Sequence, residues 1–213
     1  MAYQHDLVER VVEDRKPLCA LRPPRPGVDS PLWGEAYAYL RGRGLSPELA
    51  FANGWYPYET TEALYLVIPA ESPEPGNRWW QARLVRGHGA RWHSPSGCRR
   101  GVAWGVVRPV GPPVGTVLAE GAMDALAVAE VGWEGIALMG AQPPRPVLEA
   151  LARAPLRAPI VLVPDRDAVG TWGRVAMYFA GAAILLPSRA KDLAELPADQ
   201  RRDVLAPFAH ARG

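Results

Sequence analysis

An unbroken apolar run that ends in two acidic residues constrains the fold of this chain more than any other feature. Residues 160–163 are Ile-Val-Leu-Val, and Pro164, Asp165 and Asp167 follow directly. A short β-branched and aliphatic run without polar alternation is typical of a strand buried on both faces of a parallel sheet. The sequence therefore predicts a buried strand at this position in an α/β fold.

The two carboxylates stand where open α/β sheets bind ligands, at the carboxyl end of a strand. If the chain stays extended after the strand, Asp165 and Asp167 point to the same side, because side chains two residues apart share a face. Like charges held together repel, and a divalent cation such as Mg²⁺ relieves the repulsion. The structural alternative is a turn that caps the next helix, which is predicted over residues 168–180.

Further acids follow other predicted strands of the same half. Glu120 comes directly after the strand predicted over residues 114–119, and Asp124 lies one helical turn beyond it. Asp192 follows the last predicted strand. Acids at three strand ends indicate a shared site rather than three unrelated turns.

The pattern of predicted elements divides the chain. From residue 114, strands and helices alternate as in a doubly wound α/β unit. The elements predicted there cover residues 114–119, 122–130, 136–138, 146–152, 160–163, 169–179 and 182–186. The elements predicted upstream are helices over 3–15, 30–43 and 46–54 and strands over 64–69 and 79–85.

Composition excludes several classes of protein. Of the 213 residues, 48% are hydrophobic, yet no apolar run is as long as a membrane span. The first residues do not resemble a signal peptide, so a cytoplasmic location and no membrane partner are expected. Cys19 and Cys98 form no cluster of the kind that binds zinc, and no zinc is expected.

A basic segment rich in rings, residues 86–100, precedes the acidic half. Interleaved cations and aromatic rings favour single-stranded nucleic acid, because phosphates pair with the cations and bases stack on the rings. An ordinary solvated hairpin explains the same composition, and this alternative stays open.

Three groups of these residues resemble the signatures of a TOPRIM domain, the metal-binding fold of topoisomerases and primases. They are Glu120-Gly121-x-x-Asp124, Asp165-x-Asp167-x-x-Gly170 and Lys191-Asp192. Further stretches resemble the catalytic core of bacterial DnaG-type primases, so that the resemblance extends over residues 30–195. These stretches are 39–45, 53–55, 66–69, 81–84, 91–95, 103–106 and 138–141.

The resemblance implies a Rossmann-like TOPRIM fold, with a mostly parallel sheet and flanking helices, preceded by a smaller α+β subdomain. The implied parts are an N-terminal helix and proline-rich linker over residues 1–29, a primase-core subdomain over 30–112, and a TOPRIM domain with a C-terminal helix over 113–213.

The implied activity is metal-dependent nucleotidyl transfer, the synthesis of short primers from nucleoside triphosphates on single-stranded DNA. Mg²⁺ or Mn²⁺ is expected at Glu120, Asp165, Asp167 and Asp192, of which the first three are also expected to be catalytic. The residues expected to bind nucleic acid or nucleotide are Arg83, Arg91, Arg99, Asp124 and Lys191.

The chain also departs from the family. It shows neither the zinc ribbon nor the helicase-binding domain, so a replicative helicase or a separate zinc-ribbon protein is an expected partner, and a mobile element is an expected source. The family's second acid after Lys-Asp would fall on Ala194, while Glu195 lies one place further. Two alternatives stay open: a TOPRIM nuclease that uses the same acids to activate water, and a non-catalytic nucleic-acid-binding protein of replication.

Overall fold

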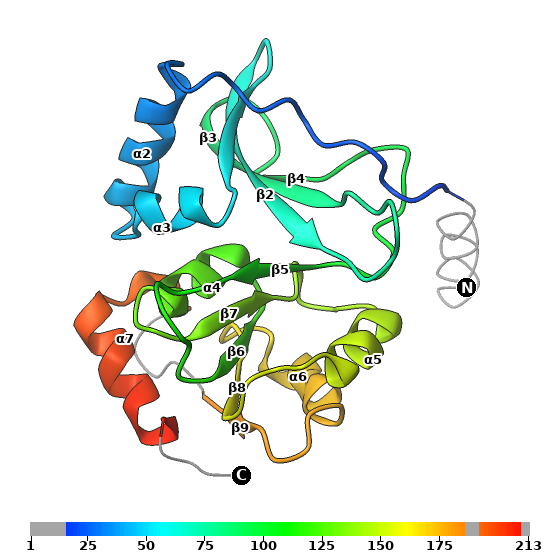
Figure 1. Ribbon diagram of the computed structural model, residues 1–213, viewed down its shortest axis with the longest axis vertical. Coiled ribbons are helices and arrows are strands. Elements are labelled where there is room, and N and C mark those ends of the chain that lie inside the picture. Colours follow the sequence, from blue (N-terminus) through cyan, green and yellow to red (C-terminus); the bar gives the residue numbers. More distant parts are fainter. Residues whose placement is uncertain (1–15, 186–191, 210–213) are drawn as a thin grey trace.

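One mixed sheet runs through the computed structural model, which describes residues 16–185 and 192–209 (Figure 1). Within these residues the sheet has nine strands in the order β4-β3-β2-β5-β7-β6-β8-β9, with β1 paired to β2. The strands are β1 Tyr56–Glu59, β2 Ala63–Glu71, β3 Trp80–Gly87, β4 Trp92–His93, β5 Trp104–Val107, β6 Thr116–Ala119, β7 Glu134–Ala137, β8 Ile160–Val163 and β9 Ala183–Ile184.

Helices flank both halves of this sheet (Figure 1). They are α2 Leu32–Gly42, α3 Pro47–Ala52, α4 Ala122–Ala129, α5 Arg145–Arg153, α6 Val169–Ala176 and α7 Ala198–Leu205, with the short 3-10 helices η1 Leu193–Glu195 and η2 Ala206–Phe208. The N-terminal helix predicted over residues 3–15 lies outside the described residues. In the part of the chain that the structure describes, no helix is both long enough and apolar enough to span a membrane.

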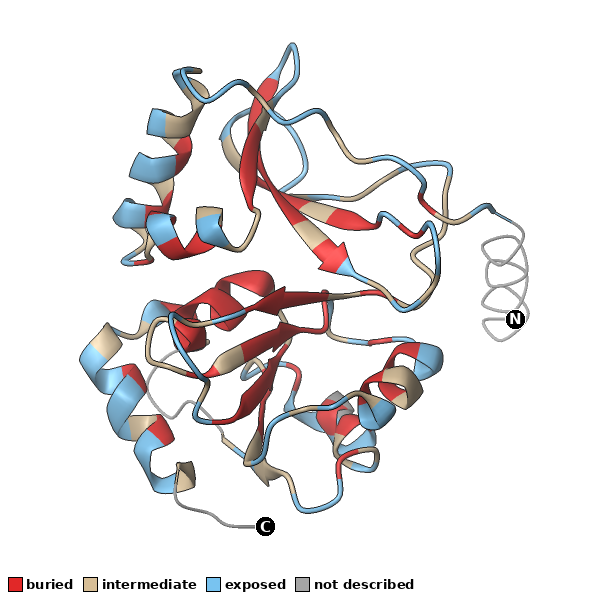
Figure 2. Ribbon diagram, viewed as in Figure 1, coloured by how far each residue is buried: buried red, intermediate tan, exposed pale blue. Residues whose placement is uncertain are grey.

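Alternating side chains of the central strands divide the C-terminal core into two layers. Leu118 and Leu162 pack against residues of α5 and α6, whereas Val117 and Val161 pack against residues of α4, η1 and α7. Side chains one residue apart point to opposite faces of a sheet, so β6 and β8 are covered on both sides. Figure 2 shows the resulting buried stripe along these strands.

The prediction of a mostly parallel, Rossmann-like sheet is wrong for the sheet as a whole. Strand β6 pairs in parallel with β7 and β8, and β8 does so with β9. The remaining pairs, β1–β2, β2–β3, β3–β4, β2–β5 and β5–β7, are antiparallel. Three of these pairs belong to the upstream strands β1–β4, and the other two belong to β5. Strand β5, which was not predicted, lies between β2 and β7 and joins the upstream strands to the parallel ones.

The predicted alternation of strands and helices is otherwise confirmed. The apolar run of residues 160–163 is β8, and its neighbours β6 and β9 are both parallel to it. Strands β1 and β4 were not predicted, because they are short and carry mixed side chains. The division of the chain at residues 112 and 113 stays a prediction, since a single sheet crosses it.

Helix α4 approaches the sheet unusually closely because its residues are small and the strand beneath it contains Gly135. All eight residues of α4, Ala-Met-Asp-Ala-Leu-Ala-Val-Ala, are buried. A Cβ atom added at Gly135 would lie 2.1 Å from the Ala125 carbonyl oxygen and 2.6 Å from the Ala125 Cα. These are backbone atoms of α4, so the contact cannot be relieved by a side-chain rotation.

We expect Gly135→Ala to lower the free energy of unfolding by about 1–3 kcal/mol, the usual cost of overpacking a core. Gly34→Ala is the matched control, because Gly34 is exposed in α2 and an added Cβ would meet nothing within 4 Å. That change should stabilise the helix by about 0.5–1 kcal/mol. Urea unfolding midpoints measure both, and equal effects of the two substitutions would contradict the close packing of α4.

Candidate active site

Acidic and basic side chains line the same pocket, which has a volume of about 230 Å³. The pocket lies where the carboxyl ends of β6 and β8 approach the β3–β4 hairpin. Its acidic residues are Glu120, Asp124, Asp165 and Asp192, and its other polar and aromatic residues are Arg43, Gln81, Arg83, Arg91 and Trp92. Six of the nine predicted site residues are therefore brought together, since Arg83, Arg91 and the four acids all line one pocket.

The parallel register of β6 and β8 explains why acids distant in sequence meet. Ala119 at the end of β6 pairs with Val163 at the end of β8, so the residues that follow both strands emerge at the same edge. Glu120 follows β6 directly, and Asp165 follows β8 after one proline. Asp124 joins them because α4 begins at once, which places it in the first turn of that helix.

Asp124 is the most deeply buried of the acids, with 6% of its surface exposed. Its Oδ1 atom accepts a hydrogen bond of 2.9 Å from the backbone amide of Ala194. Burial, together with the negative charges of Asp192 and Asp165, raises the pKa of Asp124 to about 8, although the hydrogen bond from the Ala194 amide acts in the opposite direction. The acids therefore share one electrostatic environment, in which adding negative charge is unfavourable.

The structure does not bring Asp167 into the pocket beside Asp165. The chain turns at this point, with the Ala168 amide donating a 2.9 Å hydrogen bond to the Asp165 carbonyl oxygen. The prediction that Asp165 and Asp167 point to the same side required an extended chain, and the chain is not extended here. Asp165 lines the pocket, whereas Asp167 is exposed. The role of Asp167 as a metal ligand stays a prediction.

The basic side of the pocket is held in place by aromatic contacts. Arg83 is 8% exposed, and its Nε atom donates a 2.9 Å hydrogen bond to the Tyr39 hydroxyl. Its guanidinium carbon lies 5.1 Å from the ring centroid of Trp92, a distance typical of a cation–π contact. The guanidinium of Arg83 is thus fixed before any ligand binds.

Two residues of this side were missing from the predicted site. Arg43 closes α2 and its guanidinium carbon lies 6.0 Å from the ring centroid of Tyr39. The signal that could have found it is its place in the stretch 39–45, which already resembled a primase core. Gln81 lies two residues before Arg83 in β3 and so shares its face of the sheet, and strand alternation could have identified it.

Other arginines of the basic segment lie outside the pocket. Arg99 does not line it, and its backbone amide donates to the Pro17 carbonyl oxygen at 2.9 Å, so its role in binding nucleic acid stays a prediction. Arg86 forms ion pairs with Glu35 and Glu59. Arg100 donates a 2.8 Å hydrogen bond to the Leu138 carbonyl oxygen. The lysine of the predicted site, Lys191, lies outside the described residues.

The acids of the pocket suit a hard divalent cation, because they offer only oxygen ligands. Among residues 16–185 and 192–209, no three His, Cys, Asp or Glu side chains are arranged to hold one ion together. Mg²⁺, however, is usually bound through one or two carboxylates, with waters and substrate phosphates as its remaining ligands. Glu120, Asp165 and Asp192 fit this open form of binding rather than a closed protein cage.

Comparison with solved structures identifies the fold. It is similar to that of DNA primase catalytic cores. The primase fragment of the bacteriophage T7 primase-helicase matches with a TM-score of 0.63 and 20% identity, over 94% of this chain and 85% of that one. The E. coli primase catalytic core matches with a TM-score of 0.58 and 15% identity, over 85% of this chain and 74% of that one.

A third similar structure contains ligands. It shows T7 primase domains bound to an RNA/DNA hybrid and dTTP, with a TM-score of 0.59 and 16% identity, over 82% of this chain and 91% of that one. Sequence comparison adds nothing to this, since no family model and no curated protein matches the chain. At these identities the likeness establishes the fold alone.

We expect Arg91→Ala to weaken binding of single-stranded DNA, because Arg91 is exposed and lines the pocket. Loss of one phosphate contact should flatten the slope of log affinity against log salt by about 0.7. The matched control is Arg153→Ala, which removes an exposed arginine of α5 outside the pocket. Fluorescence anisotropy of a labelled oligonucleotide at several salt concentrations gives both slopes. The same slope for both variants would show that Arg91 makes no phosphate contact of its own.

Proposed function

We propose that this chain is a DNA primase-type nucleotidyltransferase that makes short primers on single-stranded DNA at a TOPRIM-type metal site. The single observation that carries the proposal is that acids and arginines line one pocket together. Transfer of a nucleotide needs both: oxygen ligands for a divalent cation, and cations for the phosphates of the incoming triphosphate and the template. The primase-like fold supports the same conclusion.

Each side of the pocket has a proposed part in the reaction. Glu120, Asp165 and Asp192, with Asp167 as a further candidate, would hold Mg²⁺ or Mn²⁺. The cation, when bound, lowers the pKa of the attacking hydroxyl and neutralises charge that develops on the leaving pyrophosphate. Arg83 is the best placed phosphate-binding group, because its guanidinium is already held by Tyr39 and Trp92.

Asp124 has a different proposed part from the other acids. Its raised pKa favours the protonated form at neutral pH in the absence of a cation, and one oxygen is engaged by the Ala194 amide. This residue therefore supports the segment that carries Asp192, rather than contacting nucleotide directly.

A TOPRIM nuclease is the second candidate, because hydrolysis would use the same acids. The upstream half favours polymerisation: Arg43 comes from the end of α2 and Arg83 from β3, and both face the acids across the pocket. A nuclease has no need for a triphosphate site opposite its metal ligands. A non-catalytic role is disfavoured because the acids are gathered in one pocket.

The proposed partners follow from the activity. They are single-stranded DNA, nucleoside triphosphates, and a replicative helicase or a separate zinc-ribbon protein, in the cytoplasm. Among similar structures, the catalytic domain of a DnaG primase is bound to single-stranded DNA. We further propose that residues 30–112 supply the template side of the site and residues 113–213 the metal side.

We expect Asp165→Asn to reduce primer synthesis by on the order of 100-fold or more while leaving the fold intact, because it removes a charged metal ligand without changing the size of the side chain. Incorporation of labelled nucleotides on single-stranded DNA with Mg²⁺ or Mn²⁺ measures the effect. Asp167→Asn should cost much less, since Asp167 does not line the pocket. An equal loss in both variants would show instead that the turn rearranges around the metal.

The same assay decides between the two activities. Short products from triphosphates, with a higher yield from a pre-annealed primer, are expected of the intact chain. Degradation of single strands with Mg²⁺, and no incorporation with or without a primer, would favour the nuclease.

A further inference from the structure

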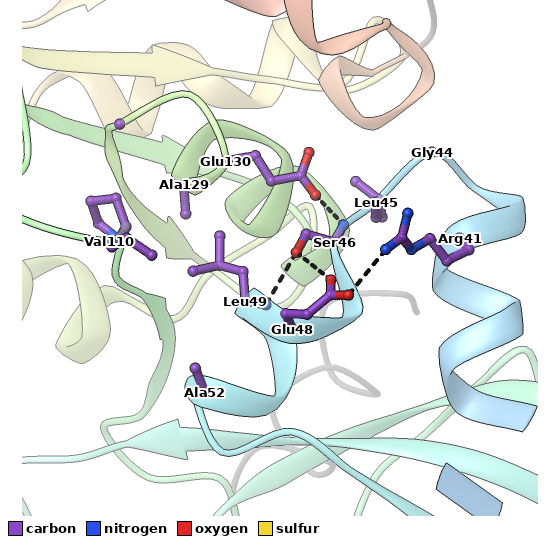
Figure 3. Close-up of a pocket in the computed structure, with 12 residues that line it drawn as sticks. Arg41, Gly44, Leu45, Ser46, Glu48, Leu49, Ala52, Val110, Ala129 and Glu130 are labelled. Carbon is purple, nitrogen blue, oxygen red and sulfur yellow. Dashed lines mark hydrogen bonds and ion pairs between the residues drawn. The ribbon is translucent and has the colours of Figure 1, made fainter. Parts of the chain in front are cut away.

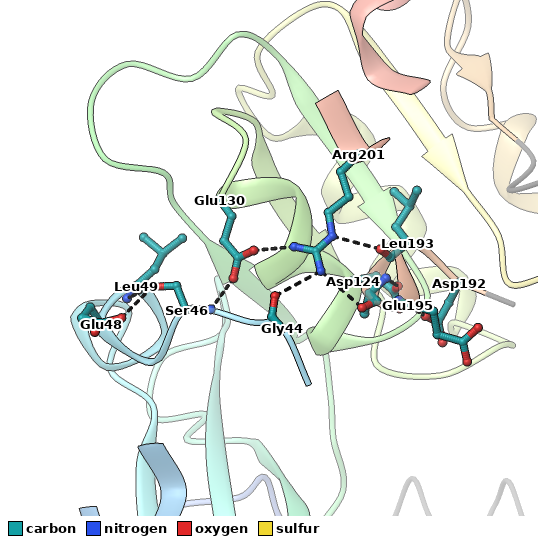
Figure 4. Close-up of polar contacts among 11 residues, drawn as sticks. Gly44, Ser46, Glu48, Leu49, Asp124, Glu130, Asp192, Leu193, Glu195 and Arg201 are labelled. Atoms are coloured by element: carbon teal, nitrogen blue, oxygen red, sulfur yellow. Dashed lines mark hydrogen bonds and ion pairs between the residues drawn. The ribbon is translucent and has the colours of Figure 1, made fainter. Parts of the chain in front are cut away.

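Arg201 is a charged residue that no sequence motif singles out. It lies in the polar helix α7, yet only 1% of its side chain is exposed (Figure 4). A buried guanidinium is costly unless its donors are satisfied, and so its partners indicate its role.

The partners of Arg201 include two successive carbonyl groups of η1, the short helix that follows Asp192. Its Nε atom donates to the Leu193 carbonyl oxygen at 3.2 Å, and its Nη2 atom donates to the Ala194 carbonyl oxygen at 3.3 Å. Both of these residues are themselves buried, with 0% and 4% exposed. Arg201 thus holds the turn from its buried side.

The turn in question carries the candidate metal ligand Asp192. The Oδ1 atom of Asp192 accepts a 3.1 Å hydrogen bond from the Glu195 amide, which fixes the carboxylate to the same turn. The Ala194 amide in turn donates to Asp124 on α4 at 2.9 Å. The position of Asp192 and the hydrogen bond to Asp124 therefore both depend on the turn that Arg201 holds.

Arg201 also reaches the opposite half of the molecule. It forms an ion pair with Glu130 (Figure 4). The other carboxylate oxygen of Glu130 accepts a hydrogen bond from the Ser46 amide (Figures 3 and 4). Its Nη2 atom lies 3.4 Å from the Gly44 carbonyl oxygen. Gly44 directly follows Arg43, which lines the basic side of the pocket. One guanidinium therefore contacts the segments that carry both sides of the site.

We propose that Arg201 is a positioning residue, which sets the η1 turn so that Asp192 faces the metal site and fixes the loop after Arg43 across from it. This inference rests on the proposed metal-dependent function. Arg201 does not line the pocket and touches none of the reacting groups, so it acts through Leu193, Ala194 and Glu130. Substitution of residues that orient metal ligands, without binding the metal themselves, typically changes metal affinity 10–100-fold.

The test uses variants that lose the hydrogen bonds of the Arg201 guanidinium without leaving an unpaired charge in the interior. In Arg201→Met combined with Glu130→Gln, no unpaired charge is left behind, and the glutamine can still accept from the Ser46 amide. Replacement of a buried ion pair by neutral groups of similar size often leaves stability unchanged. Arg201→Lys is the second variant, because it keeps the charge but loses the planar guanidinium whose two nitrogen atoms donate to the two carbonyl groups. Arg202→Met is the matched control, since Arg202 is the exposed neighbour in the same helix.

Two measurements are made on the full chain. Binding of Mn²⁺ alone, followed by the electron paramagnetic resonance of free Mn²⁺, should weaken at least about tenfold in the double variant and in Arg201→Lys, and stay unchanged in Arg202→Met. Hydrogen exchange of the Ala194 and Glu195 amides should quicken in the same two variants.

The outcomes separate this inference from the proposed function. Parental Mn²⁺ affinity together with parental amide exchange in Arg201→Lys or in the folded double variant would overturn the positioning role. If Asp192→Asn leaves the Mn²⁺ affinity of the otherwise unchanged chain as it was, the proposed metal site itself fails. The amide exchange of the Arg201 variants then still shows whether Arg201 holds the turn.

Discussion

The pairing of β6 with β8 is the constraint on which the rest of the structure depends. Because the two strands run in parallel and in register, Glu120 and Asp165 emerge at one edge of the sheet although they are far apart in sequence. Close packing of α4 on β7, which Gly135 permits, then adds Asp124 to the same edge. Any fold with this arrangement must stabilise several acidic groups in a small volume.

The chain offsets this electrostatic cost in three ways. Burial raises the pKa of Asp124 and so favours its neutral form, while the Ala194 amide engages one of its oxygens. Arginines from α2, β3 and the hairpin face the acids across the pocket. Arg201 holds the η1 turn from the buried side, through backbone carbonyl groups rather than through the acids themselves. The cationic groups that balance the acids are also those that a phosphate-bearing substrate requires.

The antiparallel strand β5 connects the two parts of the sheet whose residues line the pocket. It pairs with β2 on one side and with β7 on the other, so that the upstream meander and the parallel strands form one continuous sheet. This continuity carries Arg83 and Trp92 to the edge where the acids lie. Two segments with different patterns of hydrophobicity are thereby combined into one site.

Sequence patterns alone indicated the buried strand β8, the alternation of elements after residue 114, and the positions of Glu120 and Asp165 at the ends of strands, because strand periodicity and strand ends are local properties. Tertiary structure alone decided the direction of the pairing around β5 and the burial of Arg201 in a helix of polar composition. These features depend on contacts between segments distant in sequence. No local sequence pattern specifies which strand another strand will pair with. Nor does one specify which arginine will be buried against backbone carbonyl groups.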